Sequence, residues 1–311
     1  MYKIIKFEDF KFKVLRKIFI YLNIKDILNV RLICSKFNEI FKNDWCKYKE
    51  IELKKTIHSD ELINFLYCKK LNLSWCYLIN DLSIFNGIYL HKLNLKFCIQ
   101  IKNSSLKYIC HIKNINISGC YQITNDGIKY LKKVENINID LCPNITNQGL
   151  YYLKNVNEIS LQYCDQINDG LLLFENLKKL DLFGCKEIID EYLVNFKQLD
   201  EINLSFCNKI TDLALWYLSK IKIIYLFGCN KITDVGLSYL KNIKKFSIST
   251  TNLISDIGLF YLQNCEFIEI QFCNSITIEG VNFLKNVKFV KLISCEKIYC
   301  KKSMYNNTLI F

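Results

Sequence analysis

Ten of the sixteen cysteines in this 311-residue chain recur at an almost constant interval. The interval is 22 residues, apart from one step of 21 before Cys185 and one position in the series that Thr251 occupies. The members of this cysteine ladder are Cys76, Cys98, Cys120, Cys142, Cys164, Cys185, Cys207, Cys229, Cys273 and Cys295. Thiols can bind zinc, form disulfides or act as nucleophiles, so the spacing has to be tested against each of these chemistries.

The spacing argues against all three. Zinc sites need close ligand pairs such as Cys-x-x-Cys, which are lacking, and the histidines His58, His91 and His111 are isolated. Disulfides need an oxidising compartment, and the N-terminal residues lack the apolar segment of a secretory signal. Cys110 lies beside His111, but neighbours in sequence rarely face each other and no third group orients the pair. We expect buried structural thiols, weakly hydrogen-bonded to backbone, and no catalytic residue, metal or cofactor.

Two kinds of segment flank each ladder position. Before it, apolar and polar residues alternate, as at residues 71–73 and 93–95, which predicts a short strand with one buried face. After it, the apolar spacing becomes helical, as at residues 145–153 and 232–240, and Thr146 or Thr233 can cap the first turn. A strand and helix this short cannot bury their apolar sides alone, so the repeats must stack into a solenoid.

These repeats resemble the cysteine-containing class of leucine-rich repeat, with the pattern L-x-x-L-x-L-x-x-C-x-x-I-T-D-x-G-L-x-x-L. The resemblance covers residues 50–300, in about eleven repeats of 22 residues. It implies an α/β fold, a right-handed leucine-rich-repeat solenoid shaped as a horseshoe, with a parallel inner sheet and outer helices. Residues 301–311 form a C-terminal tail, which we expect could cap the last repeat.

Composition limits the classes of function. The net charge is +12, but the lysines are scattered along the chain, which favours a solvated surface over nucleic-acid binding. Eighteen consecutive apolar residues occur nowhere, so we expect no membrane span and a cytoplasmic or nuclear protein.

The first fifty residues do not follow the repeat. Val14, Leu15, Ile18, Phe19 and Leu22 have helical spacing, and a second helical pattern runs from Ile27 to Phe41. Three short helices make a thin core that often needs a partner. A cap that covers the open end of the solenoid would also explain this segment.

Residues 8–48 resemble an F-box, through residues 15–22, 25–28 and 33–37 and the closing Trp45. F-boxes dock on the Skp-type adaptor of SCF ubiquitin ligases, and through it on cullin and RING subunits. The resemblance implies that the adaptor-binding residues are Leu15, Ile18, Phe19, Leu22, Ile27, Leu28, Val30, Ile33 and Phe37. The usual Leu-Pro at the start of the motif is replaced here by Phe10-Lys11, and Lys13 stands where an acid often follows.

The residues one, two and four positions before each ladder position should point onto the concave face. They supply a polar row of asparagines and many aromatic side chains, which soluble proteins seldom expose in one patch without a partner. The predicted partner-binding residues are Trp75, Phe97, Tyr163, Phe183, Phe206, Tyr225, Phe227 and Phe272. Alternatively, some of these rings pack against one another and only stabilise the strands.

The leading hypothesis is a monomeric substrate receptor of an SCF-type ubiquitin ligase, which binds an unknown protein target on the concave face and contributes no catalytic residue. The rival is a non-ligase scaffold of the same fold, such as a ciliary or cytoskeletal component, which Lys11 and Lys13 favour. An enzyme has little support, because no phosphate-binding loop, metal cluster or catalytic triad is visible.

Overall fold

One parallel sheet of 13 strands, ordered in space as in sequence, dominates the computed structural model. The structure describes residues 14–15, 39–40, 50–53, 56–66, 68–298 and 308–310. The strands are β1 (Glu50–Glu52), β2 (Lys70–Asn72), β3 (Lys92–Asn94), β4 (Asn114–Asn116), β5 (Asn136–Asn138), β6 (Glu158–Ser160), β7 (Lys179–Asp181), β8 (Glu201–Asn203), β9 (Ile223–Phe227), β10 (Lys245–Ser249), β11 (Phe267–Gln271), β12 (Phe289–Ile293) and β13 (Thr308–Ile310).

Short helices connect the strands. The α-helices are α5 (Asn103–Leu106), α6 (Asn125–Ile128), α7 (Asn147–Leu150), α8 (Asp212–Tyr217), α9 (Asp234–Ser238), α10 (Asp256–Tyr261) and α11 (Ile278–Val281). The 3-10 helices are η3 (Asp60–Phe65), η4 (Ser83–Phe85), η5 (Lys107–Ile109), η6 (Lys129–Leu131), η7 (Tyr151–Leu153), η8 (Asp169–Leu173), η9 (Asp190–Leu193), η10 (Asn282–Leu284) and η11 (Glu296–Ile298).

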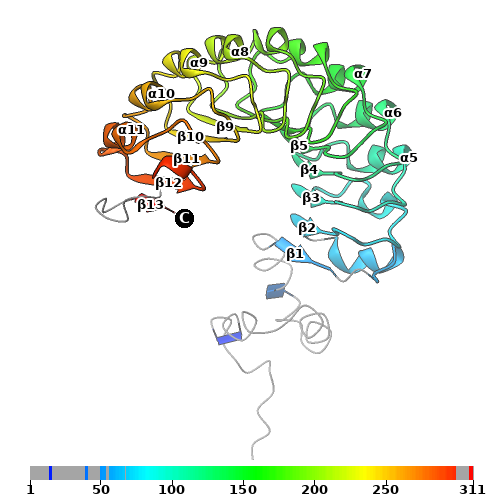
Figure 1. Ribbon diagram of the computed structural model, residues 1–311. Helices are drawn as coiled ribbons and strands as arrows, with labels where there is room; N and C mark the ends of the chain where they lie inside the picture. The colour runs from blue at the N-terminus through cyan, green and yellow to red at the C-terminus, as the bar shows by residue number, and fades with distance from the viewer. Residues whose placement is uncertain are drawn as a thin grey trace, which may run out of the picture.

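Figure 1 shows a horseshoe whose inner side is the sheet and whose outer side carries the helices. The expected α/β leucine-rich-repeat solenoid, with its parallel inner sheet and outer helices, is confirmed. The expected F-box helices fall largely outside the described residues.

The core is a layer of apolar side chains between strands and helices. In one repeat Leu93, Leu95, Cys98, Ile101 and Leu106 are all fully buried. Each large aliphatic side chain buried in this way contributes about 1.5–3 kcal/mol, and the layer is continuous from repeat to repeat. Stacking therefore supplies the stability that a single repeat lacks.

Most ladder cysteines link their repeat to the one before it. The Cys98 thiol donates to the Leu73 carbonyl at 2.9 Å, and the Cys120 thiol donates to the Leu95 carbonyl at 3.2 Å. Thr251, which replaces one cysteine, is also buried, and its hydroxyl accepts from the Leu253 N–H at 3.1 Å. The expectation of buried, backbone-bonded thiols is confirmed.

Many of the residues directly before the ladder have a left-handed backbone. Glycine occupies this position at Gly119, Gly184 and Gly228, with φ of +69°, +73° and +70°. Elsewhere larger side chains adopt the same conformation: Trp75, Phe97, Leu141, Tyr163, Phe206, Thr250, Phe272 and Ser294. An L-residue pays about 1–2 kcal/mol for such a conformation, so the turn after the strand is a costly position for a large side chain.

In six of the three-residue strands, the side chain four positions before the ladder ends the strand. In β2, the Asn72 Oδ1 accepts the Ser74 N–H at 3.0 Å, which turns the backbone and ends the strand after three residues. The equivalent bonds are made by Asn94, Asn116, Asn138, Asp181 and Asn203. Strands β9 to β12 carry other residues at this position and run for five residues.

The helix starts form a second link between repeats. The Asn125 side chain accepts the Thr146 N–H at 3.0 Å and donates to the Thr146 hydroxyl at 2.9 Å. Thr146 in turn caps α7 by accepting the Gln148 N–H. Gly149 passes so close to Asn125 that a Cβ there would lie 2.6 Å from the Asn125 Oδ1. The glycine of the Thr-x-x-Gly pattern is thus required by close approach.

The C-terminal residues 308–310 extend the sheet. Strand β13 pairs in parallel with β12, with Lys291 opposite Leu309 and Leu292 opposite Ile310. Residues 308–310 therefore lie beside the strand of the last repeat.

Candidate partner-binding face on the concave sheet

The concave face is formed by strand residues that alternate with the buried ones. They stand two, four and six positions before each ladder position, and in β9 they are Phe227, Tyr225 and Ile223. The residues between them, Ile224 and Leu226, are fully buried. Because the helices lie on the opposite side of the sheet (Figure 1), the first set faces the hollow of the horseshoe.

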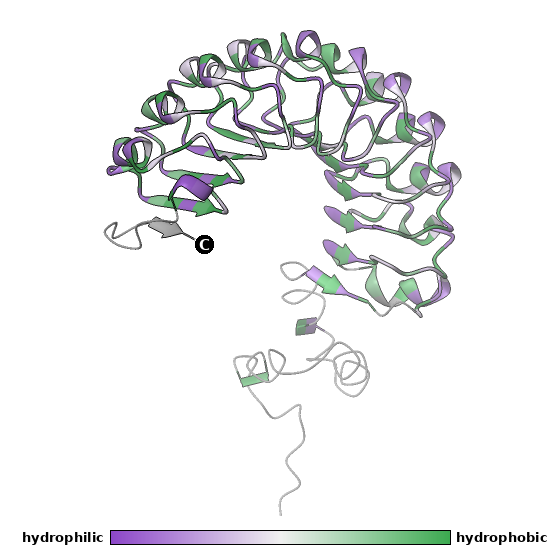
Figure 2. Cartoon of the chain, in the orientation of Figure 1, coloured by the Kyte–Doolittle hydropathy of each residue, from purple (hydrophilic) through white to green (hydrophobic). Residues whose placement is uncertain are grey.

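The chemistry of this face changes along the arc, and we divide it into three zones. The basic zone, on β2–β4, carries Lys70, Lys92 and Lys96. The acidic zone, on β5–β8, carries Asp140, Glu158, Asp181, Glu201 and one cation, Lys179. The aromatic zone, on β9–β12, carries Ile223, Tyr225, Phe227, Phe267, Phe289 and Ile293, with Lys245, Glu269 and Lys291 among them. Figure 2 shows more purple on β2–β4 and more green on β10–β12.

The acidic zone opposes the charge of the whole chain. Its four carboxylates and one ammonium give a formal charge of −3, whereas the chain carries +12. The Lys179 ammonium lies 2.8 Å from Glu201, so these two charges offset each other. Lys179 also interacts electrostatically with Glu158, which helps to raise the pKa of the lysine. One cation among four carboxylates still leaves the zone with an excess of negative charge.

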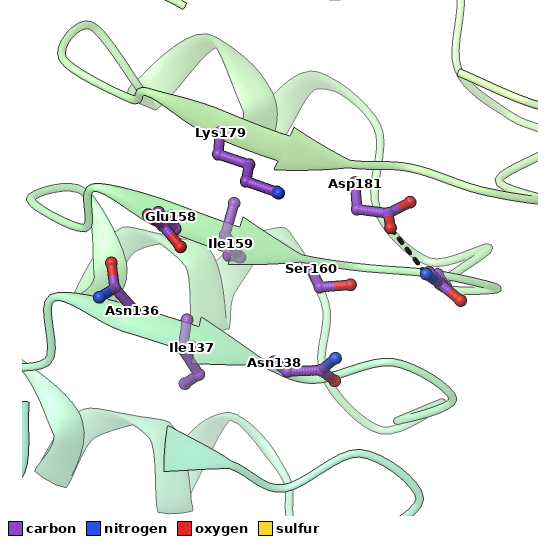
Figure 3. A pocket seen from close by; sticks show the side chains of 9 residues that line it. Asn136, Ile137, Asn138, Glu158, Ile159, Ser160, Lys179 and Asp181 are labelled. Carbon is purple, nitrogen blue, oxygen red and sulfur yellow. Dashed lines mark hydrogen bonds between the residues drawn. The ribbon is translucent and has the colours of Figure 1, made fainter. Parts of the chain in front are cut away.

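A pocket of about 290 Å³ lies at the centre of the acidic zone. Two cross-strand rows line it, Asn136–Glu158–Lys179 and Asn138–Ser160–Asp181, together with Ile137, Ile159 and Gln162. Figure 3 shows these side chains projecting from β5, β6 and β7 around the opening.

Two acceptors lie side by side in this pocket. The Asn136 amide is oriented by its Nδ2, which donates to the Asn114 Oδ1 at 2.7 Å. The Asn136 Oδ1 is buried and accepts no hydrogen bond from the described part of the chain. Glu158 is its cross-strand neighbour, and Figure 3 shows the two side chains adjacent. A donor placed between them would satisfy both.

Gln162 holds two further carboxylates in place. Its backbone N–H donates to the Asp140 Oδ1 at 2.8 Å, and its side-chain Nε2 donates to the Asp181 Oδ2 at 2.7 Å. Burial is the largest influence on Asp181 and raises the pKa of its carboxyl above the ordinary value. A cation near Asp181 would stabilise the charge that burial disfavours.

The predicted aromatic residues form two contact groups and three single positions. Trp75 stacks on Phe97 with ring centroids 4.1 Å apart. Phe183 contacts Tyr163 and Phe206 edge-on, at 5.4 and 5.1 Å. The alternative that rings pack on one another thus holds for these five.

Ring packing leaves much of the aromatic surface open. Tyr163, Phe206 and Phe272 remain 50%, 48% and 49% exposed. Tyr225 lies under the Lys245 ammonium, which is 5.1 Å from the ring centroid, and Phe227 is partly buried on the same strand.

The residues before the ladder lie over the next repeat. A Cβ at Gly119 would meet the Phe97 ring at 2.4 Å, and a Cβ at Gly184 would meet the Tyr163 ring at 2.6 Å. The rings therefore rest on glycine backbone at the carboxyl ends of the strands. Their position is fixed by the left-handed turn.

Of the predicted adaptor-binding residues, the structure describes Leu15, which is fully buried within the chain. Its replacement would disturb the packing of this chain, whatever it contacts in a partner. The other eight, Ile18, Phe19, Leu22, Ile27, Leu28, Val30, Ile33 and Phe37, lie outside the described residues.

The sequence reasoning missed the column six positions before the ladder, which supplies Asn136, Glu158 and Lys179 to the pocket. Extending the strand alternation by one residue pair would have found this column. The asparagine row was expected to face a partner, but its Oδ1 atoms are used to end the strands.

The buried cysteines of the ladder are poor nucleophiles. Burial raises the pKa of the Cys98 and Cys142 thiols to about 12, and that of Cys164 to about 11. Within the described ranges, no group of three or more His, Cys, Asp or Glu side chains is arranged to hold a metal ion. In the same ranges, no helix has the length and apolar character needed to cross a membrane.

Comparisons with known proteins agree with this architecture. The F-box domain family matches residues 12–49. This chain therefore joins an F-box domain to a leucine-rich-repeat solenoid. No curated protein matches the sequence.

Several solved structures resemble this chain at low sequence identity. The crystal structure of the Rad7 and Elc1 complex in yeast matches with a TM-score of 0.55 and 16% identity, over 96% of this chain and 90% of that one. An internalin (inlF) of Listeria monocytogenes matches with a TM-score of 0.58 and 18% identity, over 80% of this chain and 70% of that one. At such identities the likeness concerns the fold.

Proposed function

We propose that this F-box protein is the substrate-recognition subunit of an SCF-type E3 ubiquitin ligase and binds a protein target on its concave face for ubiquitin-dependent degradation. The observation that carries the proposal is the F-box match at residues 12–49, directly before a solenoid with a long exposed face. The F-box would bind a Skp-type adaptor, and the adaptor the cullin and RING subunits. A cytoplasmic or nuclear location is part of the proposal.

The mechanism is proximity. A receptor that holds the target near a ubiquitin-charged enzyme raises the effective concentration of the target's lysines, and it needs no reactive group of its own. The buried thiols with their raised pKa values suit this non-catalytic role. One structural neighbour is a protein solved in complex with a second protein, the Rad7 and Elc1 pair, which is compatible with an adaptor partner.

The aromatic residues support a binding role for the face. Trp75, Phe97, Tyr163, Phe206 and Phe272 occupy left-handed positions that glycine fills in three other repeats. Each costs about 1–2 kcal/mol relative to an ordinary backbone. Ring contacts offset part of this cost, but Tyr163, Phe206 and Phe272 remain 50%, 48% and 49% exposed. Strain retained at an exposed site is common where a residue serves recognition.

The rival is a scaffold of the same fold that binds a partner but no ligase. The departures at Lys11 and Lys13 from the usual F-box start favour it. The two proposals agree about the concave face and differ only in the F-box.

Co-purification separates the two proposals. We expect the full-length chain to capture the Skp-type adaptor in equimolar amount, and Ile18→Ala with Phe19→Ala to lose it, because an apolar docking surface would be removed. Phe272→Gly is the matched control, since it removes a ring from the solenoid and should leave capture unchanged. A wild-type chain that binds no adaptor would support the scaffold.

A further inference from the structure

The zones of the concave face specify the chemistry of its occupant. We propose that the face binds an extended segment of the target in which a lysine or arginine side chain enters the central pocket and an apolar side chain contacts the aromatic zone. This inference rests on the proposed function only in taking the occupant to be a protein target.

The pocket is suited to a cationic side chain. Glu158 forms no ion pair with the described residues, Asn136 Oδ1 lacks a donor, and Asp181 is partly buried. An ammonium or guanidinium group supplies several N–H donors and a positive charge, which matches the adjacent Asn136 and Glu158 acceptors. The Asp181 carboxylate, on the next cross-strand row, adds negative charge to the same pocket. Lys179 does not fill this role, because its ammonium is 2.8 Å from Glu201.

Charge complementarity favours the same occupant over an acidic one. The surrounding zone carries −3 on a chain of +12, so an acidic segment would be drawn to other surfaces of the molecule and repelled here. The pocket volume of about 290 Å³ accommodates one long side chain and no folded element.

The aromatic zone provides the second contact. Tyr225 on β9 and Phe267 on β11 flank Lys245, whose ammonium lies 5.1 and 4.9 Å from the two ring centroids. The space between these two rings is taken by Lys245, but Phe289 on β12 is 64% exposed. An apolar side chain of the target can pack against it, and aromatic rings are frequent anchors of protein interfaces.

The spacing between the two contacts follows from the sheet. The pocket is centred on β6 and the aromatic zone on β10, four strand intervals away. At about 4.8 Å per interval this is roughly 19 Å, which an extended segment crosses in about six residues. The basic and the apolar residue of the target should therefore lie about six residues apart in sequence.

Selection from a library of random twelve-residue peptides, displayed against the full-length chain, tests the inference. We expect the enriched peptides to combine a lysine or arginine with an aromatic or aliphatic residue about six positions away. Enrichment of acidic peptides, of peptides without a basic residue, or of none at all would overturn it.

Pocket variants connect the selected peptides to the site. In fluorescence anisotropy with one enriched peptide, Glu158→Gln and Asp181→Asn should each weaken binding about tenfold, because each removes a charged hydrogen-bond acceptor. Glu187→Gln is the matched control, since Glu187 is exposed and paired with Lys209 outside the pocket. An equal loss in the control and in Glu158→Gln would contradict the proposed pocket.

The result of the peptide-binding experiments is independent of the result of the adaptor co-purification. Peptide binding with normal adaptor capture supports both proposals. Loss of adaptor capture with intact peptide binding overturns the ligase role alone, whereas normal capture with no peptide binding overturns the inference alone.

Discussion

Asp181 occupies a strand position that asparagine fills in five other repeats: Asn72, Asn94, Asn116, Asn138 and Asn203. Its Oδ1 accepts the Phe183 N–H at 3.0 Å, a bond that an asparagine carbonyl makes equally well. For this strand-ending bond the charge adds nothing that asparagine would not supply, and burial disfavours it. The second oxygen, Oδ2, accepts the Gln162 Nε2 at 2.7 Å. At this residue, folding favours the amide and recognition of a cation favours the carboxylate.

Asp181→Asn should stabilise the fold once the Gln162 amide turns to present its Oε1 to the new Nδ2. Because burial raises the folded-state pKa of Asp181 above its unfolded value, the ionised carboxylate lowers the free energy of unfolding at neutral pH. The gain should be about 1 kcal/mol or less. It should shrink as the pH falls through the folded-state pKa, where the wild-type carboxyl takes up its proton. Urea unfolding at pH 7 and at acidic pH measures this, and a variant less stable at pH 7 would contradict it.

The strands and helices of each repeat can be short because contacts with the neighbouring repeats stabilise them more than bonds within each element do. Thr146 caps a helix of four residues, and the same threonine bonds to Asn125 of the preceding repeat. Isolated helices of this length do not form in water. Each helix start is therefore held by its neighbour, and the glycine that lets the two repeats approach is part of that contact.

Gly149→Ala should destabilise the solenoid although alanine is the better helix former. The added Cβ would lie 2.6 Å from the Asn125 Oδ1 and would push the two repeats apart. Overpacking of this kind costs about 1–3 kcal/mol. Gln148→Ala, which removes only an exposed bond from the Asn125 Nδ2 at 3.3 Å, should change stability by less than about 0.5 kcal/mol. Thermal unfolding midpoints compare the two, and equal midpoints would refute the role given to the glycine.

Most repeats of the molecule contain one ladder cysteine. The reactivity of that thiol therefore indicates whether its repeat is folded. The ladder cysteines are buried, and their raised pKa values leave almost no thiolate near neutral pH. Cys110 is exposed on the outer side of the same solenoid. A thiol reagent therefore distinguishes the open from the closed state of individual repeats.

Iodoacetamide at pH 8 should modify Cys110 at once and the ladder cysteines only as repeats unfold. Because each repeat contacts only its neighbours, labelling in rising urea should begin in particular repeats and spread along the ladder. Mass spectrometry of the digested protein identifies the labelled positions. Rapid native labelling of Cys120 or Cys207 would show that the thiols are not held as the structure has them.

The repeat made much of this architecture predictable. Strands, helices, buried thiols and the horseshoe follow from a 22-residue period, because repeated environments reinforce one weak local pattern many times. The left-handed turn was not predicted, because only Gly119, Gly184 and Gly228 mark it and aromatic residues are poor indicators of such a backbone.

The pocket could not be predicted for a different reason. Its residues are unremarkable one by one, and Asn136, Glu158 and Lys179 meet only through the register of three strands from different repeats. The strand-ending bonds of the asparagine row likewise depend on backbone geometry that residue type alone does not fix. The assigned roles of the F-box residues outside the described ranges stay predictions.

The rings that rest on glycine have a consequence for affinity. Phe97 and Tyr163 are held by a fixed backbone turn below and a neighbouring glycine beside them, so they have already given up much of their rotational freedom. A partner that binds these rings therefore causes little further loss of side-chain entropy, and more of the contact energy remains as binding free energy. The free-energy cost of the left-handed backbone is part of folding, so it does not reduce the affinity for a partner.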